Sequence, residues 1–336
     1  MEKRVQSYLI EILNCPVCHG ELQWEITQRT GERIEQAEAS CEECAAVYPV
    51  FEGVGLFLTP DLPRDDLWEQ AGSQLAKFLR EHPEVEQQLM GVPVDELAPA
   101  DLFYRALVLE EGGEYAAAKM LEERAKQGLY TDQYLACWES QVNYVINRLS
   151  ESDGPIVDLA SGRCSLVEEM ARRLDRAIVA TDFSPRVLRQ DRHRLESFGL
   201  YDKISLLAFD ARRMPFREDA VETLTTNVGL PNIEKPGDLL KELRRVVDGQ
   251  FLAISHFYSE KDEANAKALR EAGLSSLIFR KAAVEDFIAS GWEVEVANEC
   301  QAWTEPTPRG EVLDGAQIDA FPVQGTVLEW CVIEAR

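Results

Sequence analysis

The sequence lacks several features that assign a chain to common protein classes. It has no run of 18 or more apolar residues, and Glu11 interrupts the hydrophobic stretch near its start, so neither a membrane span nor a secretory leader is expected. It also has no internal repeat, no G-x-x-x-x-G-K-[ST] loop and no G-x-S-x-G elbow. We therefore expect a cytoplasmic protein that makes no membrane contact and is not a P-loop or α/β-hydrolase enzyme.

Basic residues are scarce. The 336 residues contain 35 Lys and Arg against 60 Asp and Glu, which gives a net charge of −25. Residues 1–60 contain four basic residues and ten acidic ones. Because binding to a phosphate backbone depends on lysine and arginine, this charge argues against nucleic acid as a partner and repels anionic membranes. Cations are attracted instead.

Glycine is scarce in the stretch "IVDLASGRCSL", residues 156–166, which has the pattern of a buried strand, a tight turn and a helix start. A dinucleotide loop needs G-x-G-x-x-G, but those positions hold Ala160, Gly162 and Ser165, and Asp158 adds negative charge. S-adenosylmethionine has no phosphate and carries a sulfonium and an ammonium group. The residues therefore favour this methyl donor over a dinucleotide.

Strand and helix patterns alternate from about residue 150 to the C-terminus, which predicts a doubly wound parallel α/β sheet. The last two strands have no helix pattern between them, so they are expected to form an antiparallel pair at one edge. The predicted strands are 156–160, 177–182, 204–210, 221–227, 250–257, 292–299 and 326–333.

The first three of these strands contain or end in an acidic residue. Asp158 lies at the first turn, Asp182 ends the second strand and Asp210 ends the third. Ligands of such sheets lie beyond the carboxyl ends of the strands. There Asp182 can accept the ribose hydroxyls, Asp210 the adenine amino group, and Asp158 can meet an ammonium group. The alternative for Asp182 is a structural helix N-cap before "SPRVL".

Four stretches in order, "VDLASGRCSL", "VATDFSPRVL", "LLAFDARRMPF" and "LTTNVGLPNI", resemble the motifs of class I S-adenosylmethionine-dependent methyltransferases. The resemblance covers about residues 150–260, and "NVGLPNIEKPGDLLKELRRVV" is similar to quinone-biosynthesis C-methyltransferases. It implies a Rossmann-like seven-stranded sheet and methyl transfer from S-adenosylmethionine to a small-molecule acceptor, on carbon or oxygen.

The resemblance also implies roles for individual residues. At the donor site, the methionine end would lie near Asp158, Ala160 and Gly162, the ribose at Asp182, the adenine at Phe183, Asp210 and the Ala211 backbone, and the methyl group near Asn227. Ala160 and Cys164 stand where the family commonly has glycine. We expect Cys164 to need room and a negative φ.

Two C-x-x-C pairs, Cys15/Cys18 and Cys41/Cys44, predict a tetrahedral four-thiolate site for structural zinc. His19 is expected to be a turn residue. The surrounding residues, about 12–58, resemble small zinc-ribbon activators of methyltransferases and the ribbon of certain ribosomal-RNA guanine methyltransferases. Since basic residues are few here, we expect the ribbon to pack on its own chain or on a protein partner.

Residues 60–150 show helical periodicity, including a helix expected over 65–82. Tyr130, Tyr134 and Trp138 are spaced to share a helix face, either as a core stripe, which we favour, or as a wall of the substrate pocket. The basic run around Arg189, Arg192, His193 and Arg194 is expected to be a solvated helix face. The predicted units are a zinc ribbon (1–59), a helical linker or cap (60–150) and a methyltransferase domain (151–336).

His256, near the end of the fifth strand, is the candidate catalytic base, needed only if the acceptor loses a proton during attack. Two alternatives remain open: an RNA methyltransferase that uses the ribbon for recognition, and a non-enzymatic interaction protein whose donor site has decayed. A protein partner or a second copy, if one binds, is expected at the ribbon or at the helical segment.

Overall fold

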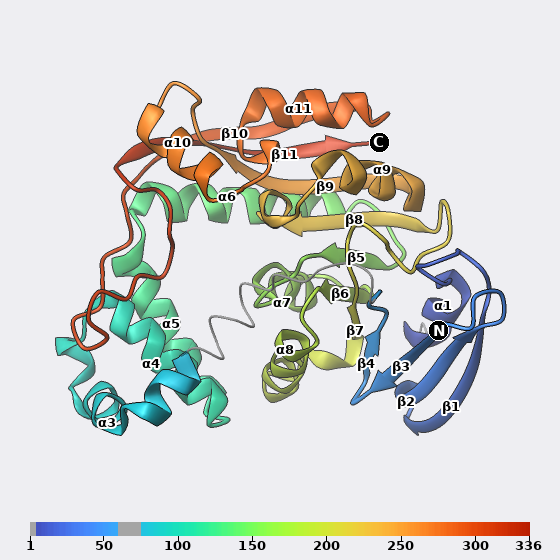
Figure 1. Ribbon diagram of the computed structural model, residues 1–336, viewed down its shortest axis with the longest axis horizontal. Coiled ribbons are helices and arrows are strands. Elements are labelled where there is room, and N and C mark those ends of the chain that lie inside the picture. Colours follow the sequence, from blue (N-terminus) through green and yellow to red (C-terminus); the bar gives the residue numbers. More distant parts are fainter. Residues whose placement is uncertain (1–4, 60–74) are drawn as a thin grey trace.

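The computed structural model describes residues 5–59 and 75–336, which form one continuous eleven-stranded sheet with helices on both faces (Figure 1). The strands follow the order β1-β2-β3-β4-β7-β6-β5-β8-β9-β11-β10. Their bounds are β1 Leu22–Thr30, β2 Arg33–Cys41, β3 Val47–Phe51, β4 Val54–Leu56, β5 Ile156–Leu159, β6 Ile178–Asp182, β7 Ile204–Ala208, β8 Val221–Asn227, β9 Val247–Phe257, β10 Val294–Thr304 and β11 Thr326–Ala335.

Strands β5 to β11 form the predicted seven-stranded unit. Neighbours from β7 through β6, β5 and β8 to β9 are parallel, while β11 pairs antiparallel with both β9 and β10. The doubly wound sheet and the antiparallel edge pair are thereby confirmed. Each predicted strand overlaps an observed one. Strands β5, β6 and β7 are short apolar runs buried on both faces, whereas the edge strand β10 is partly exposed.

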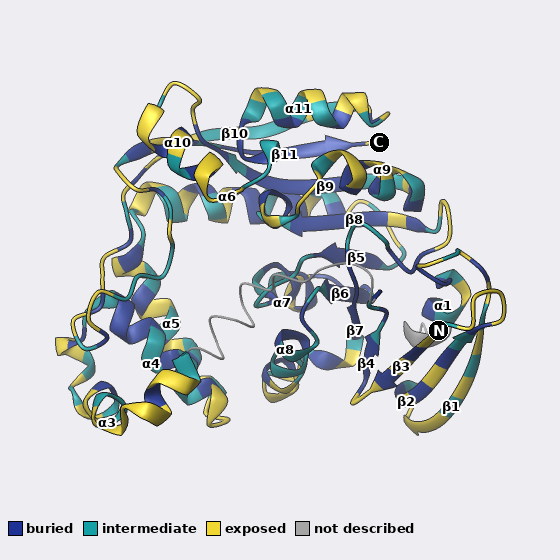
Figure 2. Cartoon of the chain, in the orientation of Figure 1, coloured by how far each residue is buried: buried dark blue, intermediate teal, exposed yellow. Residues whose placement is uncertain are grey.

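Helices cover both faces of this unit, and two buried clusters lie between them and the sheet. One cluster includes residues of α6, α7, α8 and α10, and the other includes residues of α9, α11 and the ribbon. The helices are α6 Asp132–Leu149, α7 Ser165–Arg173, α8 Pro185–Ser197, α9 Pro236–Val246, α10 Glu263–Glu271 and α11 Arg280–Ala289. Figure 2 shows the central strands buried, so a ligand can reach this sheet only at the strand ends.

The N-terminal ribbon, α1 (Val5–Ile12) and β1 to β4, continues the same sheet. Its strand β4 pairs in parallel with β7, in the register Val54 with Leu206 and Leu56 with Ala208. Arg33 lies 3.6 Å above the ring of Tyr201 and donates to the Tyr201 carbonyl at 2.6 Å. The ribbon therefore packs on its own chain, which is one of the two predicted arrangements.

The basic run on α8 is not a solvated helix face, although His193 is exposed. Arg194 is only 6% exposed, and Arg192 donates to Glu35 of the ribbon at 2.8 Å and to the carbonyl of Glu52. The prediction was wrong for these two arginines because α8 lies next to the ribbon on one side and the turn after β5 on the other. A charge run in the sequence does not show which neighbours will neutralise it.

The helices that precede α6 form a separate layer, at the lower left of Figure 1. They comprise the helical residues 75–81, α3 (Pro83–Gly91), the short η1 (Val94–Glu96), α4 (Pro99–Glu111) and α5 (Tyr115–Leu129). The first part of the helix predicted over 65–82 lies outside the described residues. Among the described helices, none has the length and apolar content that crossing a membrane requires.

The long connection between β10 and β11 reaches this helical layer (Figure 1). The carboxylate of Asp101 on α4, fully buried, accepts from the backbone N–H groups of Glu311, Val312 and Leu313 at 2.7 to 3.0 Å. Helix α6, by contrast, packs on the sheet itself, where Gln141 donates to the Asn298 carbonyl of β10 at 2.9 Å. The connection between β10 and β11 thus joins the helical layer to the sheet domain through Asp101.

Candidate functional site

The turn after β5, residues 160–164, has an unusual backbone. Ala160, Gly162 and Cys164 all lie in the left-handed region, with φ of 51°, 51° and 55°. The expectation of a negative φ at Cys164 was wrong: this residue is the left-handed N-cap of α7, and its side chain is fully buried. Each non-glycine residue in this region costs about 1–2 kcal/mol, so contacts outside the turn have to stabilise it.

Several of these contacts come from the neighbouring strand β6. The Ser161 hydroxyl donates to the Asp158 carbonyl at 3.0 Å and accepts from the Thr181 N–H at 3.1 Å. The N–H of Gly162 donates to Asp182 Oδ2 at 3.0 Å. The carboxylate predicted to bind the ribose is therefore in direct contact with the turn predicted to bind the methionine end.

Asp182 is not the N-cap of α8. Ser184 fills that position, where its hydroxyl accepts from the Val187 N–H, and Asp182 Oδ1 accepts from the Ser184 N–H at 3.0 Å. The structural alternative for Asp182 is thus not the arrangement observed. A carboxylate has about four acceptor positions, and a ribose diol needs two of them.

Asp210 follows β7 and is engaged by its own neighbour Arg212. The guanidinium donates in a bidentate fashion, Nε to Oδ1 at 2.9 Å and Nη2 to Oδ2 at 2.7 Å, and the Arg212 N–H also donates to Oδ1 at 2.9 Å. Both side chains are largely buried, at 5% and 10% exposure. Any ligand amino group that binds Asp210 has to compete with, or displace, this arginine.

Asp158 lies beneath the turn and is 1% exposed. Its carboxylate accepts from Thr225 Oγ1 of β8 at 2.6 Å. Burial raises its pKa to about 7, with a smaller contribution from the charge of Asp182 and an opposing one from the Thr225 and Ser161 hydrogen bonds. Asp158 therefore changes its charge near neutral pH.

Asn227 ends β8 and lies opposite the turn. Its Nδ2 donates to the Ser165 hydroxyl at 3.3 Å, and its buried Oδ1 has no hydrogen-bond partner among the described residues. Two residues on, a Cβ at Gly229 would lie 2.8 Å from the Cβ of Ala160 and 2.9 Å from Thr226 Oγ1. This close approach explains the small residues at positions 160 and 229.

His256 lies on β9, one strand beyond β8, inside a group of aromatic rings. Its ring centroid is 4.9 Å from Trp330, 5.9 Å from Tyr258 and 6.4 Å from Tyr134. Burial lowers its pKa to about 4, so the ring is neutral at pH 7, and its Nδ1 is buried without a partner among the described residues. Tyr130 precedes α6 rather than lying on it, and its ring stacks on Tyr134 at 4.7 Å.

The structure therefore brings all the predicted donor residues and the candidate base His256 to one edge of the sheet. Strands β7, β6, β5, β8 and β9 are consecutive neighbours, and their carboxyl ends or the turns after them hold the whole set. The set is Asp158, Ala160, Gly162, Asp182, Phe183, Asp210, Ala211, Asn227 and His256.

The four predicted zinc ligands also lie together. The Sγ atoms of Cys15, Cys18, Cys41 and Cys44 are all within 4.8 Å of one another, with Cys15 3.5 Å from Cys44 and Cys18 3.4 Å from Cys41. Sulfur atoms of a tetrahedral zinc site with bonds of about 2.3 Å are roughly 3.8 Å apart, so the set fits zinc. The Tyr48 hydroxyl, 3.2 Å from Cys15 Sγ, supports the cluster. His19 has a φ of 60°, as a turn residue can.

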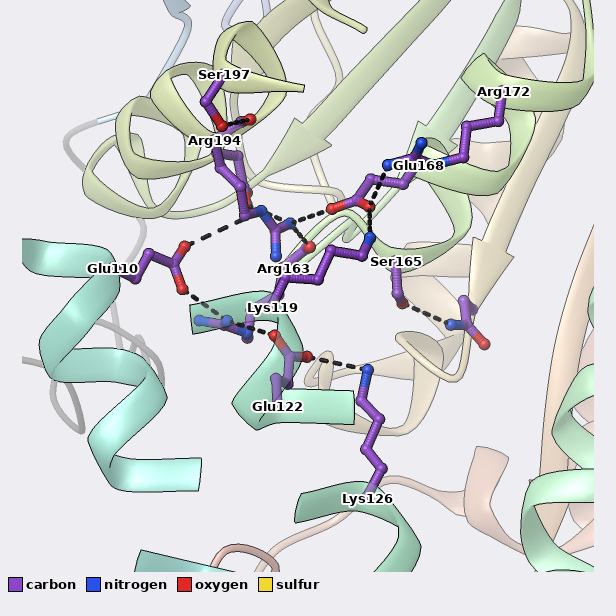
Figure 3. Close-up of polar contacts among 12 residues, drawn as sticks. Glu110, Lys119, Glu122, Lys126, Arg163, Ser165, Glu168, Arg172, Arg194 and Ser197 are labelled. Carbon is purple, nitrogen blue, oxygen red and sulfur yellow. Dashed lines mark hydrogen bonds and ion pairs between the residues drawn. The ribbon is translucent and has the colours of Figure 1, made fainter. Parts of the chain in front are cut away.

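Sequence reasoning missed a group of charged residues behind the turn after β5, residues 160–164, which we call the donor turn because the methionine end of the donor is predicted to bind there. Figure 3 shows Arg163 of the turn and Arg194 of α8 among carboxylates of α4, α5 and α7. These side chains border a cavity of about 430 Å³ between α5, α6 and α7. The residues involved are distant in the sequence, so no local pattern marked them.

Two family models match this chain. The family model of a methyltransferase domain matches residues 156–249, and that of Trm112p-like proteins matches residues 6–53. Residues 156–249 are thus similar to a methyltransferase domain, and residues 6–53, which hold the four-cysteine cluster, are similar to Trm112p-like proteins. This confirms the predicted resemblance, and S-adenosylmethionine and zinc, the predicted cofactor and metal, are those that fit the two domains.

Individual relatives match part of the methyltransferase domain. The chain is 27% identical over 94 residues to the ubiquinone/menaquinone biosynthesis C-methyltransferase UbiE of Pectobacterium carotovorum, which is 27% of this chain and 38% of that protein. It is 34% identical over 92 residues to the demethylmenaquinone methyltransferase of Clavibacter sepedonicus, which is 27% and 36% of the two chains. The matched stretch thus spans less than half the length of each relative.

Among solved structures, the YcgJ protein of Bacillus subtilis is 13% identical, with a TM-score of 0.46 over 59% of this chain and 97% of that one. The geranyl diphosphate C-methyltransferase of Streptomyces coelicolor A3(2), solved with S-adenosyl-L-homocysteine, is also 13% identical. Its TM-score is 0.44 over 59% of this chain and 75% of that one.

Proposed function

We propose that the chain transfers the methyl group of S-adenosylmethionine to a small-molecule acceptor, on carbon or oxygen. The observation that supports this most directly is the set of polar side chains at consecutive strand ends in the domain that the methyltransferase model matches. The names of the relatives, which act in quinone biosynthesis, make a quinone-like aromatic ring the favoured acceptor. When bound, the donor supplies an electrophilic methyl group and its own leaving group.

The proposed roles of the donor residues follow the strand order. Asp182 accepts the ribose hydroxyls, and Phe183 contacts the adenine. Asp210 and the Ala211 backbone hold the adenine amino group after Arg212 has moved. The turn of Ala160 and Gly162 lies along the methionine end, above Asp158, and Asn227 lies near the reacting methyl group. Because the donor carries two positive charges, these carboxylates also favour it electrostatically.

At the acceptor side, the rings around His256 form an apolar environment in which Trp330 and Tyr258 are buried. The half-buried Tyr134 is the ring of this group that would orient an aromatic acceptor, since offset and edge-on ring pairs are favourable. We propose that the neutral His256 accepts a hydrogen bond from an acceptor hydroxyl through Nδ1, because a pKa of about 4 makes the ring a weak base for removing the proton. Alignment of acceptor and methyl group is the main task of the protein in such a displacement.

RNA methylation has less support. Arg33, one of the few basic residues of the ribbon, stacks on Tyr201 of its own chain instead of facing outward. A protein partner at the ribbon or at the helical layer, and a cytoplasmic location, stay predictions. We also propose the three units 1–59, 60–150 and 151–336, with α6 acting as a helix of the sheet domain despite its place before residue 150.

Calorimetry with S-adenosylhomocysteine tests the proposed donor site. We expect Asp182→Asn to weaken binding by at least about 10-fold, since charge-assisted hydrogen bonds contribute about 1.5–3 kcal/mol each. Asp175→Asn is the matched control, because Asp175 is 97% exposed and lies before β6, at the opposite end of the strand. If the wild-type chain fails to bind, or both variants bind as it does, the proposed donor site is wrong.

A further inference from the structure

The side chain of Arg163 leaves the donor turn and reaches the helical layer. Its Nη2 donates to Glu110 Oε2 on α4 at 2.7 Å and to Glu122 Oε2 on α5 at 3.0 Å (Figure 3). The three side chains are 20%, 9% and 15% exposed, so solvent screens this bridge only weakly. One residue of the turn thus joins both helices.

The main chain of the same residue is held from another side. Arg194 of α8 donates to the carbonyl of Arg163 and, at 3.0 Å, to Asp191 Oδ1. Its guanidinium also lies 3.5 Å from Glu168 of α7. The backbone of Arg163 is therefore fastened to α8, while its side chain is fastened to α4 and α5.

The turn needs such contacts. Arg163 stands between the left-handed residues Gly162 and Cys164, and Ala160 is left-handed as well. Only the glycine adopts these angles without strain, and a strained backbone persists only where the surroundings determine it. If the turn relaxed and Arg163 moved away, Glu110 and Glu122 would lose the cation that they share, although Lys126 lies 3.0 Å from Glu122 and Arg194 4.0 Å from Glu110.

The bridge is charged at neutral pH. Burial alone would raise the pKa of Glu122, but the charges of Arg163 and Lys126 lower it to about 2. Burial likewise opposes the charged form of Arg163, whose pKa is nevertheless raised by Glu122 and Glu110. The ionic contacts, rather than neutral hydrogen bonds, thus link the turn to the helices.

We propose that Arg163 is a positioning residue that couples the donor turn to helices α4 and α5, so that tight binding of S-adenosylmethionine requires the docked helical pair. This inference rests on the proposed function, because it takes the turn as the site of the methionine end. The helical layer then reaches the turn itself through Arg163, while the pairs Lys119–Glu168 and Arg186–Glu111 join α5 to α7 and α4 to α8.

The test compares the full chain with the variant Arg163→Gln/Glu110→Gln/Glu122→Gln. This variant removes the ion pairs without leaving a buried charge unpaired, which by itself would destabilise the fold. The matched control is Arg124→Gln/Asp95→Asn, which removes the pair between α5 and η1 where the side chains are 48% and 85% exposed. Two quantities are measured: the dissociation constant of S-adenosylhomocysteine by calorimetry, and hydrogen exchange of residues 160–165 without ligand.

We expect the neutral variant to bind S-adenosylhomocysteine at least 10-fold more weakly than the wild type. The backbone amide hydrogens of residues 160–165 should exchange faster, and the melting temperature should equal that of the control variant. Arg163→Lys, which keeps the charge but cannot bridge two carboxylates as a planar guanidinium does, should fall between. It also replaces the triple variant if that fails to fold.

Unchanged affinity and unchanged exchange in the neutral variant would overturn the proposal. So would a lower melting temperature with wild-type affinity, because that result describes a purely structural bridge. If the wild-type chain binds no S-adenosylhomocysteine, the proposed function fails, and the exchange measurement still decides whether Arg163 holds the turn.

Discussion

The pKa of Asp158 leads to a quantitative prediction about stability. This carboxyl is 1% exposed and has a pKa of about 7, whereas the ordinary value is 3.8. The folded chain therefore binds this proton more tightly than the unfolded chain does. This proton contributes about 4 kcal/mol to the free energy of unfolding below about pH 4, and the contribution is lost as the pH rises to 7 and above.

The substitution Asp158→Asn removes this titration and keeps an acceptor for Thr225. Between pH 5.5 and 8.5, the free energy of unfolding of the variant should rise relative to the wild type by about 2 kcal/mol, measured by urea unfolding. Asp191, whose pKa burial also raises to about 7, titrates in both proteins and cancels in this difference. The exposed Asp314→Asn is the control. A difference that stays constant with pH would refute the reasoning.

Three further predictions concern the metal, the adenine site and the donor turn. Chelation should release about one zinc per chain, measured with a metal indicator, and should lower the melting temperature of the ribbon, measured by calorimetry. The double variant Cys15→Ser/Cys41→Ser should lose the zinc and melt at a lower temperature in the same way. An unchanged melting temperature would contradict this. Arg212→Gln should tighten binding of S-adenosylhomocysteine several-fold, because it frees Asp210 from its bidentate partner; weaker binding in calorimetry would mean that the arginine itself contacts the ligand. Cys164→Gly should destabilise the fold by about 1 kcal/mol in urea unfolding, because the loss of a buried side chain outweighs the relieved strain; a stabilised variant would mean that strain dominates.

The sequence was sufficient to predict the sheet and the edge at which the site lies. Each central strand is a short apolar run between helical patterns, and parallel strands with crossover helices end at one edge. Asp182 and Asp210, each at or just after the end of a predicted strand, had to lie near the turn that follows Asp158. The geometry of the edge is a consequence of topology, so it needed no knowledge of side-chain contacts.

The contacts around these residues could not be predicted in the same way. Cys164 combines a left-handed φ with a fully buried side chain, and no local pattern in "SGRCSL" indicates either. Arg163 meets carboxylates 53 and 41 residues earlier in the chain. The neutralisation of Arg192 by Glu35 likewise depends on the docking of the ribbon, 157 residues away. In each case the observed contact depends on tertiary packing, which the local sequence does not show.

The pair of Asp210 and Arg212 is the exception, because the two residues are neighbours in "FDARRMPF". Their spacing allows an arginine to fold back on a carboxylate, but it does not say whether solvent, a ligand or the arginine occupies that carboxylate. In the ligand-free chain the arginine occupies the carboxylate, and both side chains are shielded from solvent. If Asp210 binds the adenine amino group as proposed, the neutral amino group replaces the cationic Arg212 as the partner of this carboxylate.

The zinc ribbon is connected to the donor site by direct packing. The Tyr48 hydroxyl contacts Cys15 Sγ, and the Tyr48 ring stacks on Phe57 at 5.3 Å. The N–H of Phe57 donates to the carbonyl of Ala208 at 2.8 Å, at the end of β7 and two residues before Asp210. Because β7 would otherwise be the edge strand of the methyltransferase sheet, the ribbon fixes the strand end that carries Asp210. The metal cluster thus supports the adenine side of the proposed site, while Arg163 and the helical layer support the methionine side.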